Sequence, residues 1–441
     1  MRERDAGTRE YQRIRGCLFF GFFGVFGCFG IFLFPQSVAA AYPTLTYRYH
    51  HHLFVINPNG EPAWRAHEEV WFFRGTQIRP PQRFLVDGDV IPPLPDGVER
   101  STRVAWNTDA IAATISRKIG AALDREAGTV TIGKDQAGKI VFEGLGLTGL
   151  QVDTRRAAAL TVAAIEAGVP DVILPVTEIQ PTLTVHDPEL AALGIREVVA
   201  IGDSNFARSP AARRHNIAVG AARFNGHLIP QGATFSFNEV LGPVNAAMGY
   251  KKELVILGER TLPDYGGGLC QVSTTAYRGI WEYGFPIESR KNHSFAVQYY
   301  APQGTDATIY PPNIDMKFVN DSPGALLMQT HVEGDNAYFI YYGTRDTRES
   351  EIVGPYTWNK RAPPPDKFEY TSDIEPGTTR VVGKAVPGLQ AAWFRIVRPV
   401  NGQEKTEPVF SAYEARPNFT QIGVAALQLP SLDVPETDAG N

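Results

Sequence analysis

An uncharged, phenylalanine-rich run close to the N-terminus constrains the fold of this chain more than any other feature. The run extends from Gly16 to Phe34 and follows five arginines: Arg2, Arg4, Arg9, Arg13 and Arg15. Its length approaches the roughly 20 apolar residues that span a bilayer, and flanking arginines remain on the cytoplasmic side of a membrane. We therefore expect residues 1–41 to be a cytoplasmic basic tail followed by a membrane anchor or signal peptide, with the rest of the chain exported.

Small residues after this run leave two outcomes open. Ser37-Val-Ala39 and Ala39-Ala-Ala41 both fit a signal-peptidase site, whereas the apolar run is longer than the usual signal-peptide core of roughly 7–15 residues. The length favours an uncleaved, single-pass anchor in the cell membrane, and cleavage would make the body a secreted protein. In both cases we expect the C-terminal body to lie outside the cytoplasm.

Cysteine usage decides how the exported body must be stabilised. Cys17 and Cys28 lie within the apolar run, so Cys270 is the sole cysteine of the remaining chain. The body cannot form an internal disulfide and must rely on hydrophobic cores, for which its roughly 400 residues suffice in two or three domains. The 33 prolines and 42 glycines favour turns and strands over long helices. We expect an α+β, multidomain and β-rich protein.

The charge of the chain argues against a nucleic-acid partner. The formal net charge is -5 and the pI is about 6.0, whereas nucleic-acid binding needs a basic stripe or patch. The sequence also contains no basic low-complexity run. We therefore expect no nucleic-acid partner, and we expect no cofactor.

Changes in pattern divide the exported body into domains. Strand-like segments with Pro and Gly breaks come first, and helical spacing at Ile111, Ile115 and Ile119 then begins an α+β module that ends near Val185. A proline-rich stretch separates the later segment that carries the chemistry from a tail rich in strand formers. The expected divisions are 42–188 for the strand-rich region and α+β module, 189–346 for the third segment, 347–366 for a linker, 367–428 for a β-rich domain and 429–441 for a flexible tail.

Three consecutive histidines, His50, His51 and His52, are a possible metal motif. Adjacent residues of a strand point to opposite faces, so at most His50 and His52 could share a ligand. A second set has suitable ligand types but no recognisable zinc spacing: Cys270, His215, His227 and His293. We favour a solvated strand edge for the three histidines and expect no metal.

Cys270 comes directly after a glycine run, in Tyr265-Gly-Gly-Gly-Leu-Cys-Gln-Val-Ser-Thr-Thr275. Apolar residues at helical spacing from Val272 to Trp281 predict a helix that Cys270 opens. Unpaired N–H groups and the positive end of the helix dipole favour a thiolate and could hold a developing oxyanion. The arrangement indicates a nucleophile for acyl transfer. A buried structural cysteine in a glycine turn is the alternative.

Two residues downstream could complete a catalytic set with Cys270. His293 lies among polar residues in the segment 288–295, where a histidine gains little from packing. It could instead serve as the base or the ion-pair partner that a thiolate nucleophile needs. Asp306, in a Gly-Thr-Asp sequence, could orient the imidazole, or it could be a turn residue that bonds its own backbone. The expected catalytic residues are therefore Cys270, His293 and Asp306.

Polar residues around these motifs are candidates for binding a peptide. Arg290 could grip a carboxylate through two parallel hydrogen bonds, or it could form a surface ion pair with Glu288. Side-chain amides could contact a substrate or brace a turn, and glycines leave room for a ligand to approach the main chain. The expected substrate-binding residues are Gly267, Gly268, Gln271, Arg290, Asn216 and Asn238.

Five motifs occur in order between residues 190 and 344: His215-Asn-Ile-Ala-Val-Gly220, Ile229-Pro-Gln-Gly-Ala-Thr-Phe-Ser-Phe-Asn238, Gly266-Gly-Gly-Leu-Cys-Gln271, Arg290-Lys-Asn-His293 and Gly304-Thr-Asp-Ala307. One such motif would be weak, but five with compatible spacing are specific. The segment that contains them resembles the VanW family. The α+β module resembles the peptidoglycan-binding domain found ahead of VanW domains, and the tail resembles a G5 domain.

The resemblance implies a setting in the cell envelope and a reaction. VanW proteins are associated with glycopeptide-antibiotic resistance, and some VanW-domain proteins are described as L,D-transpeptidases whose family cysteine is the nucleophile. By this likeness Cys270 would attack the carbonyl of the third residue of a peptidoglycan stem, expel the terminal D-alanine and form a thioester, which an amine of a neighbouring stem would resolve. The alternative is a non-catalytic peptidoglycan-binding accessory protein, in which Cys270 and Gln271 line a ligand pocket or a core turn.

Overall fold

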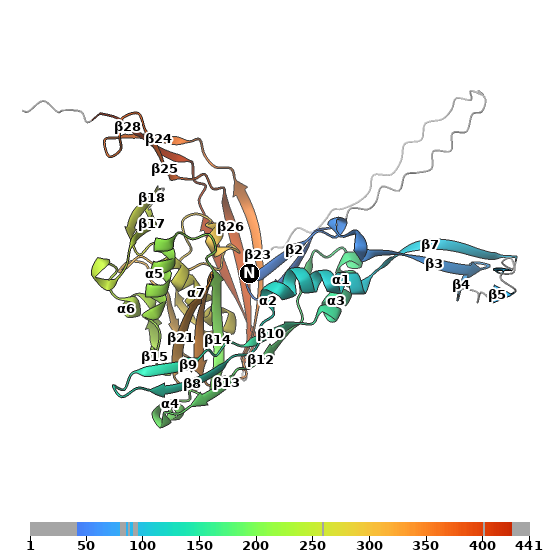
Figure 1. Cartoon of the computed structure of the whole chain (residues 1–441), viewed down its shortest axis with the longest axis horizontal. Helices are drawn as coiled ribbons and strands as arrows, with labels where there is room; N and C mark the ends of the chain where they lie inside the picture. Colours follow the sequence, from blue (N-terminus) through green and yellow to red (C-terminus); the bar gives the residue numbers. More distant parts are fainter. Residues whose placement is uncertain are drawn as a thin grey trace, which may run out of the picture. The chain divides into compact units, whose positions relative to one another are not determined.

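The computed structural model describes residues 42–79, 85–86, 89–90, 96–257, 260–399 and 402–425. The expected membrane anchor or signal peptide at 1–41 and the expected flexible tail at 429–441 lie outside these residues. In the described part of the chain, no helix is both long and apolar enough to cross a membrane. Strands form most of the regular structure, as the composition predicts, and they are grouped in several separate sheets (Figure 1).

The N-terminal region combines small sheets with short helices. Its described elements are β1 (Leu45–Tyr49), β2 (His52–Ile56), η1 (Pro58–Gly60), η2 (Pro62–Trp64), β3 (Arg65–Phe73), β4 (Thr76–Ile78), β5 (Leu85–Val86), β6 (Asp89–Val90), β7 (Val98–Trp106), α1 (Thr108–Ile115), η3 (Ser116–Gly120), α2 (Ala121–Leu123), β8 (Thr129–Lys134), β9 (Ile140–Gly144), β10 (Gly149–Val152), α3 (Thr154–Ala167), β11 (Asp171–Ile173), β12 (Val176–Ile179) and β13 (Thr182–Val185). The side chains of Asn107 and Asp153 cap α1 and α3 by accepting hydrogen bonds from first-turn amides. Both helices share a core with the β11-β1-β2 sheet, in which Tyr47 and Trp64 are fully buried.

The central region carries the helices around which the candidate site is built. Its described elements are α4 (Pro188–Ala192), β14 (Glu197–Asn205), α5 (Ala211–Ala222), β15 (Leu228–Ile229), β16 (Thr234–Ser236), α6 (Phe237–Leu241), η4 (Ala246–Met248), β17 (Lys252–Leu257), β18 (Arg260–Tyr265), α7 (Leu269–Tyr283), β19 (Ile287–Ser289), η5 (Gln298–Tyr300), β20 (Lys317–Val319), β21 (Leu326–Glu333) and β22 (Asn336–Gly343). The main sheet has the order β14-β22-β21-β15, and α7 packs against β14 and β22. The helix predicted at Cys270 is confirmed as α7, which begins one residue earlier.

The expected boundary at residue 188 separates sequence patterns but not hydrophobic cores. The β13-β8-β9 sheet of the α+β module packs against the central region. Val130 and Ile132 on β8 are fully buried in one cluster with Ile340 and Tyr342 on β22. The module and the central region therefore stabilise each other.

The C-terminal region consists of two three-stranded sheets. Their strands are β23 (Glu349–Arg361), β24 (Lys367–Thr371), β25 (Thr379–Gly383), β26 (Gly388–Arg398), β27 (Lys405–Tyr413) and β28 (Phe419–Gly423), in the orders β23-β26-β27 and β24-β28-β25. The expected linker at 347–366 is wrong over most of its length, because β23 pairs with β26 from Glu349 to Arg361. Proline clusters only after that strand, at 363–365, so the true connection to β24 is short.

Strand β26 also completes the core around α7. The indole of Trp393 is buried and meets the ring of Trp281 edge-on, with centroids 5.9 Å apart. Nη1 of Arg395 donates hydrogen bonds to the carbonyls of Trp281 and Phe285, at 3.0 and 2.8 Å. A cation at these positions satisfies carbonyls at the C-terminal end of the helix and complements its dipole. The end of α7 opposite Cys270 is thus held by the C-terminal region.

A contact between two glycines sets the distance of α7 from the main sheet. A Cβ added to Gly279 on α7 would lie 2.4 Å from the backbone nitrogen of Gly202 on β14, and one added to Gly202 would lie 2.0 Å from the carbonyl oxygen of Thr275. No real side chain fits at such distances, so the helix backbone rests directly on the strand. This contact places the first turn of α7, and with it Cys270, at a defined height above the sheet.

We predict that Gly279→Ala destabilises the protein by about 1–3 kcal/mol, because the added methyl group must push α7 away from β14. Denaturant unfolding followed by tryptophan fluorescence measures the change. The matched control is Gly133→Ala on β8, where an added Cβ meets nothing within 4 Å, and which should change the stability by no more than about 0.5 kcal/mol. Equal stability of the two variants would contradict the backbone contact.

Candidate active site

Packing, rather than an open ligand groove, explains the glycines ahead of Cys270. Gly268 caps α7 at φ +117°, in the left-handed region, and a Cβ there would lie 3.2 Å from Cγ of Arg213. A Cβ on Gly267 would lie 2.8 Å from Cβ of Glu253 on β17. The expected substrate-binding role of Gly267 and Gly268 is therefore replaced by a structural one: they let the loop pass between α5 and β17.

The thiol of Cys270 lies in the first turn of α7, and the residue is partly exposed. Its Sγ is 3.4 Å from Oγ1 of Thr308 and 3.7 Å from the carbonyl oxygen of Ile309. Two first-turn amides are already occupied, because the N–H groups of Leu269 and Gln271 donate to the carbonyls of Gly266 and Gly268. The helix start therefore offers fewer free donors to an oxyanion than the sequence suggests.

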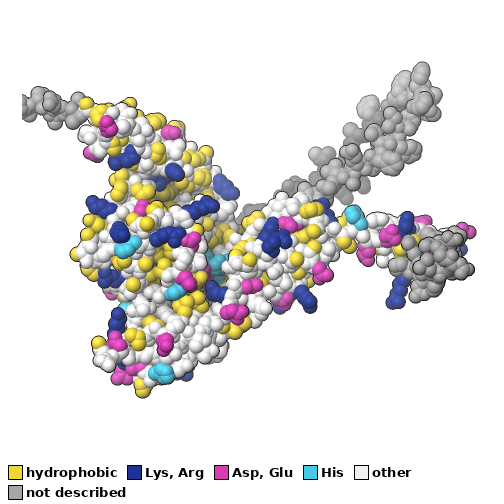
Figure 2. All heavy atoms as spheres, viewed as in Figure 1, with side chains coloured by type: hydrophobic (Ala, Val, Ile, Leu, Met, Phe, Trp, Pro, Cys, Tyr) yellow, Lys and Arg dark blue, Asp and Glu magenta, His cyan; other side chains and the backbone are white. Residues whose placement is uncertain are grey.

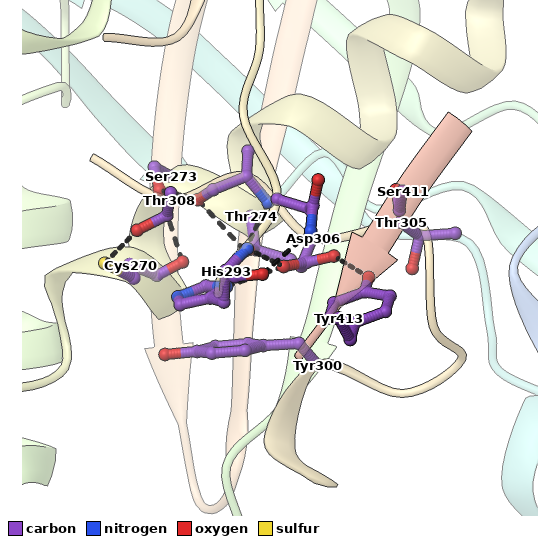
Figure 3. Close-up of polar contacts among 12 residues, drawn as sticks. Cys270, Ser273, Thr274, His293, Tyr300, Thr305, Asp306, Thr308, Ser411 and Tyr413 are labelled. Atoms are coloured by element: carbon purple, nitrogen blue, oxygen red, sulfur yellow. Dashed lines mark hydrogen bonds and ion pairs between the residues drawn. The ribbon is translucent and has the colours of Figure 1, made fainter. Parts of the chain in front are cut away.

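His293 is held in place by Asp306, as Figure 3 shows. Nδ1 of His293 donates to Oδ2 of Asp306 at 2.6 Å, and the backbone N–H of His293 donates to the same oxygen at 2.8 Å. Both side chains are buried, with 4% and 2% exposed. The ring of Tyr300 stacks on the imidazole, with centroids 4.3 Å apart and planes 13° apart. Asp306 thus orients the imidazole and does not act as a turn residue.

The other ring nitrogen of His293 is turned to the thiol. In Figure 3 the imidazole lies between Cys270 and Asp306. Nε2 of His293 is buried and has no hydrogen-bond partner within ordinary bonding geometry among the described residues, while the thiol and imidazole shift each other's pKa. The structure therefore brings together the three expected catalytic residues in the order thiol, imidazole, carboxylate.

The electrostatics of this set favour an ion pair. Burial raises the pKa of the Cys270 thiol, but His293 outweighs burial and, with Thr308, lowers the pKa from 9.0 to about 7. Burial lowers the pKa of His293, but Asp306 and Cys270 outweigh it and raise the pKa from 6.5 to about 9. Between these two values the proton resides on the imidazole. Cys270 is then a thiolate beside an imidazolium.

Arg290 binds Asp306 inside the protein and is not free to bind a ligand. Its side chain is only 7% exposed. Nε and Nη2 donate to the carbonyls of Asp306 and Gly304, Nη2 also donates to Oδ1 of Asp306 at 3.2 Å, and Nη1 donates to Oγ of Ser411. Its expected roles as a carboxylate grip and as a partner of Glu288 are both wrong, because its donors are used inside the protein. Arg290 instead helps to keep the pKa of Asp306 well below its usual range, against the effect of burial.

The side-chain amides of Asn216 and Asn238, which we expected to contact a substrate, form hydrogen bonds with the backbone. Asn216 is fully buried, accepts from the N–H of Lys251 and donates to the carbonyls of Lys251 and Gly267, which fixes the glycine loop. Nδ2 of Asn238 donates to the carbonyl of Ile314 at 2.9 Å. The side chain of Asn216 is thus fully used inside the protein, whereas Oδ1 of Asn238 is buried without a partner among the described residues.

Arg213 is a residue that the sequence interpretation missed. It lies in the first turn of α5 and is 8% exposed, and its Nη2 lies 3.2 Å from Oε1 of Gln271 and 3.4 Å from the hydroxyl of Tyr300. No described carboxylate forms an ion pair with it, and Nη1 of Arg213 and Nε2 of Gln271 are buried donors without partners. Arginine in a helical sequence is unremarkable, so no local signal marks it.

Gln271, which we expected to bind substrate, accepts a hydrogen bond from Arg213 through its Oε1, and its contact with a substrate stays a prediction. The guanidinium of Arg213 therefore contacts the residue that follows Cys270 and the tyrosine whose ring stacks on His293. Its plane is also covered by the ring of Tyr299, 4.3 Å from the guanidinium carbon. Nη1 of Arg213 and Nε2 of Gln271 are thus two buried, unpartnered donors near the start of α7, one of them positively charged.

Comparison with known proteins supports this central region as a unit. Residues 212–342 match the family described as "VanW like protein". The chain is 32% identical over 139 residues to "Uncharacterized protein YoaR" of Bacillus subtilis, covering 32% of this chain and 46% of that protein. It is 30% identical over 112 residues to "Vancomycin B-type resistance protein VanW" of Enterococcus faecalis, covering 24% of this chain and 40% of that protein.

Two solved structures with G5 domains also match part of the chain. The G5 domain of an IgA1 protease is 22% identical, with a TM-score of 0.12, and covers 19% of this chain and 100% of that structure. HP0197-G5 is 14% identical, with a TM-score of 0.09, over 18% of this chain and 96% of that structure. The chain spans less than half of the length of the two curated relatives. Residues 212–342, which contain Cys270, His293 and Asp306, are therefore the part of this chain that is similar to the VanW family.

Proposed function

We propose that this protein is a cell-envelope cysteine acyltransferase that acts on peptidoglycan stem peptides, with L,D-transpeptidation as its reaction. The observation that carries the proposal is the set formed by Cys270, His293 and Asp306. A partly exposed cysteine whose thiol has a pKa of about 7, beside an oriented imidazole, is an activated nucleophile with a proton donor in place. A structural cysteine has no need of the buried carboxylate that orients its neighbour.

The unpartnered donors of Arg213 and Gln271 support a substrate with a carboxylate. Arg213 places a positive charge in the first turn of α5, where the helix dipole disfavours a cation, and it is buried without an anionic partner among the described side chains. Such a charge becomes favourable when a ligand brings the anion. We propose that Arg213 binds the carboxylate of the terminal D-alanine, which would place the preceding peptide bond at Cys270.

In the acylation step, the Cys270 thiolate attacks the carbonyl carbon of the third stem residue and forms a C–S bond. The negative charge moves to the carbonyl oxygen, and Nε2 of the His293 imidazolium gives its proton to the departing amine. The C–N bond then breaks and free D-alanine leaves. The products are a thioester on Cys270 and a neutral imidazole that is still held by Asp306.

In the second step, the side-chain amine of a neighbouring stem attacks the thioester carbonyl. Neutral His293 accepts a proton from the attacking nitrogen, the C–S bond breaks, and Cys270 leaves as a thiolate beside the restored imidazolium. The result joins the third residues of two stems. Water in place of the amine would give a carboxypeptidase with the same first step.

The N-terminal sequence and one relative support a location in the cell envelope. We propose that residues 1–41 anchor the chain in the cell membrane, or export it if they are cleaved, and that peptidoglycan is its partner. One relative is named for vancomycin resistance, which agrees with a role at the cell wall. Basic and acidic side chains are interspersed on the face in Figure 2 and form no basic stripe there, so that face offers no nucleic-acid surface.

A non-catalytic peptidoglycan-binding protein is the second candidate. The same observation on Arg213 and Gln271 favours it, because two vacant buried donors could hold a stem peptide without any covalent step. The two candidates differ in the need for a thiol at position 270 and for a base at position 293. The following predictions separate them.

We predict that the wild-type protein forms a thioester adduct with a tetrapeptide stem and releases D-alanine, measured by intact mass and amino-acid analysis. Cys270→Ser should bind the same stem without forming an adduct, and His293→Ala should slow acylation by roughly 10²–10⁴-fold, because it removes the proton donor and base. Equal binding by all three proteins, with no adduct and no D-alanine from the wild type, would make the protein a recognition module.

We predict that the rate of Cys270 alkylation by iodoacetamide rises as the pH increases through about 7, because only the thiolate reacts and its pKa is about 7. Asp306→Asn removes the group that raises the pKa of His293, so the imidazolium is lost at lower pH and the thiol midpoint moves up towards 9.0. Asp335→Asn, which removes the surface partner of Arg214, is the control and should leave the midpoint unchanged. An identical midpoint in all three proteins would contradict the proposed ion pair between Cys270 and His293.

We predict that Arg213→Gln selectively weakens acylation by stems that end in a free carboxylate. The wild type should prefer the free acid over the corresponding C-terminal amide by roughly 10- to 100-fold in kcat/KM, the range of a charged hydrogen bond, and the variant should lose this preference. Arg214→Gln on the same helix is the control, because Arg214 already pairs with Asp335. If Arg213→Gln keeps the preference for the free acid, then another residue recognises the carboxylate.

A further inference from the structure

The three consecutive histidines do not lie in a single extended strand. Tyr49 on β1 pairs with His52 on β2, so His50 and His51 form the two-residue turn of a hairpin. His50 has φ +49°, a conformation that L-residues with a side chain adopt infrequently. The expected strand alternation, which would put His50 and His52 on one face, is therefore wrong. The turn instead brings the rings of His51 and His52 together, with centroids 4.1 Å apart.

A carboxylate from the main sheet lies against these two rings. Asp203 is on β14, and its Oδ1 is 3.3 Å from Nε2 of His52. One possible ligand atom from each of His51, His52 and Asp203 lies within 4.8 Å of the other two. The side chains are 3%, 27% and 22% exposed, respectively. Three metal-ligating groups from two distant segments thus converge away from bulk solvent.

A second carboxylate orients one of the rings from behind. Nδ1 of His51 lies 2.6 Å from Oε1 of Glu282, which is in the last turn of α7 and is 7% exposed. This contact leaves Nε2 of His51 to act as a ligand. A carboxylate that accepts the second ring N–H of a histidine is the usual support of a metal-bound imidazole.

The spacing of one ligand pair fits a tetrahedral ion, and the other two pairs lie within 4.8 Å. Two ligands that are bound at about 2.0–2.1 Å with tetrahedral angles lie roughly 3.3–3.5 Å apart, and the contact between His52 and Asp203 has this length. His52 and Asp203 also border a cavity of about 230 Å³, which has room for a water molecule as fourth ligand. The formal charges that line this cavity balance, with three carboxylates and three guanidiniums: Asp203, Glu178, Glu282, Arg125, Arg345 and Arg348.

We infer that His51, His52 and Asp203 bind one divalent transition-metal ion, with Glu282 as the positioning residue of His51. Two imidazoles and one carboxylate match the preferences of Zn²⁺ and not those of Mg²⁺ or Ca²⁺, which take mainly oxygen ligands. The ion links the β1-β2 hairpin to β14 and, through Glu282, to α7. It is separate from Cys270, which lies at the opposite end of α7, and does not depend on the acyl-transfer proposal.

Metal binding to the untagged full chain tests this inference. All proteins carry Cys270→Ser, so that this thiol cannot bind the ion. They are stripped with a chelator and dialysed against Zn²⁺, and their zinc content is measured by mass spectrometry of the metal. Co²⁺ is used as a spectroscopic probe, because tetrahedral coordination gives strong visible absorption. We expect the parent protein to hold one more ion per chain than the His52→Ala or Asp203→Asn variant, and only the parent to show the absorption.

Two further variants keep the outcome interpretable. Glu282→Gln should retain the ion with an affinity that is roughly 10- to 100-fold lower, because a supporting hydrogen bond is weakened and no ligand is lost. His331→Ala is the matched control, since His331 lies 3.3 Å from Glu333 but has no third ligand group, and it should bind like the parent. Each variant is melted with chelator present to show that it is folded. Equal zinc content and equal Co²⁺ spectra in the parent, His52→Ala and Asp203→Asn proteins would overturn the inference.

Discussion

The buried carboxylate of Asp306 is the point at which the candidate active site and the C-terminal region meet. It accepts hydrogen bonds from the ring and backbone of His293, from Arg290 and from the hydroxyl of Tyr413 on β27. Arg290 is itself bound to Ser411 on the same strand. A buried anion is tolerable only when its lone pairs are satisfied in this way. The charge that raises the pKa of His293, and so lowers that of Cys270, therefore depends on a strand more than 100 residues away.

Helix α7 connects this carboxylate to the rest of the molecule. Its first turn carries Cys270, its middle rests on β14 through Gly279, and its last turn carries Glu282 beside His51. Ser273 and Thr274 on the same helix bind the backbone of Ala307 and so hold the segment of Asp306 and Thr308. The helix is buried almost all round, so both of its ends are positioned by packing and not by loops. The proposed thiol chemistry and the proposed metal site share one rigid support.

The parts of the site that could be predicted from the sequence are those that depend on neighbouring residues in the chain. A glycine run followed by apolar residues at helical spacing favours a helix start, so the position of Cys270 at the beginning of a helix could be predicted. His293 and Asp306 were recognisable by residue type and by their place among polar neighbours. Arg290, Asn216 and Asn238 were assigned to a ligand because side chains with free donors look the same whether their partner is a substrate or a distant carbonyl. The same limit applies to residues 349–361, whose sequence predicts a linker but which form a strand because they pair with β26.

The sequence by itself determined the β-rich character of the chain, the start of α7 and the three chemical groups of the candidate set, because these follow from composition, helical periodicity and residue type. Only the tertiary structure decided which charges are buried and what they face. It left Arg213 without an anionic partner among the described residues, used Arg290 to hold Asp306, and turned the histidine triplet so that His51 and His52 meet Asp203. These arrangements join residues from distant parts of the chain, and long-range packing leaves no periodic trace in the sequence around each residue.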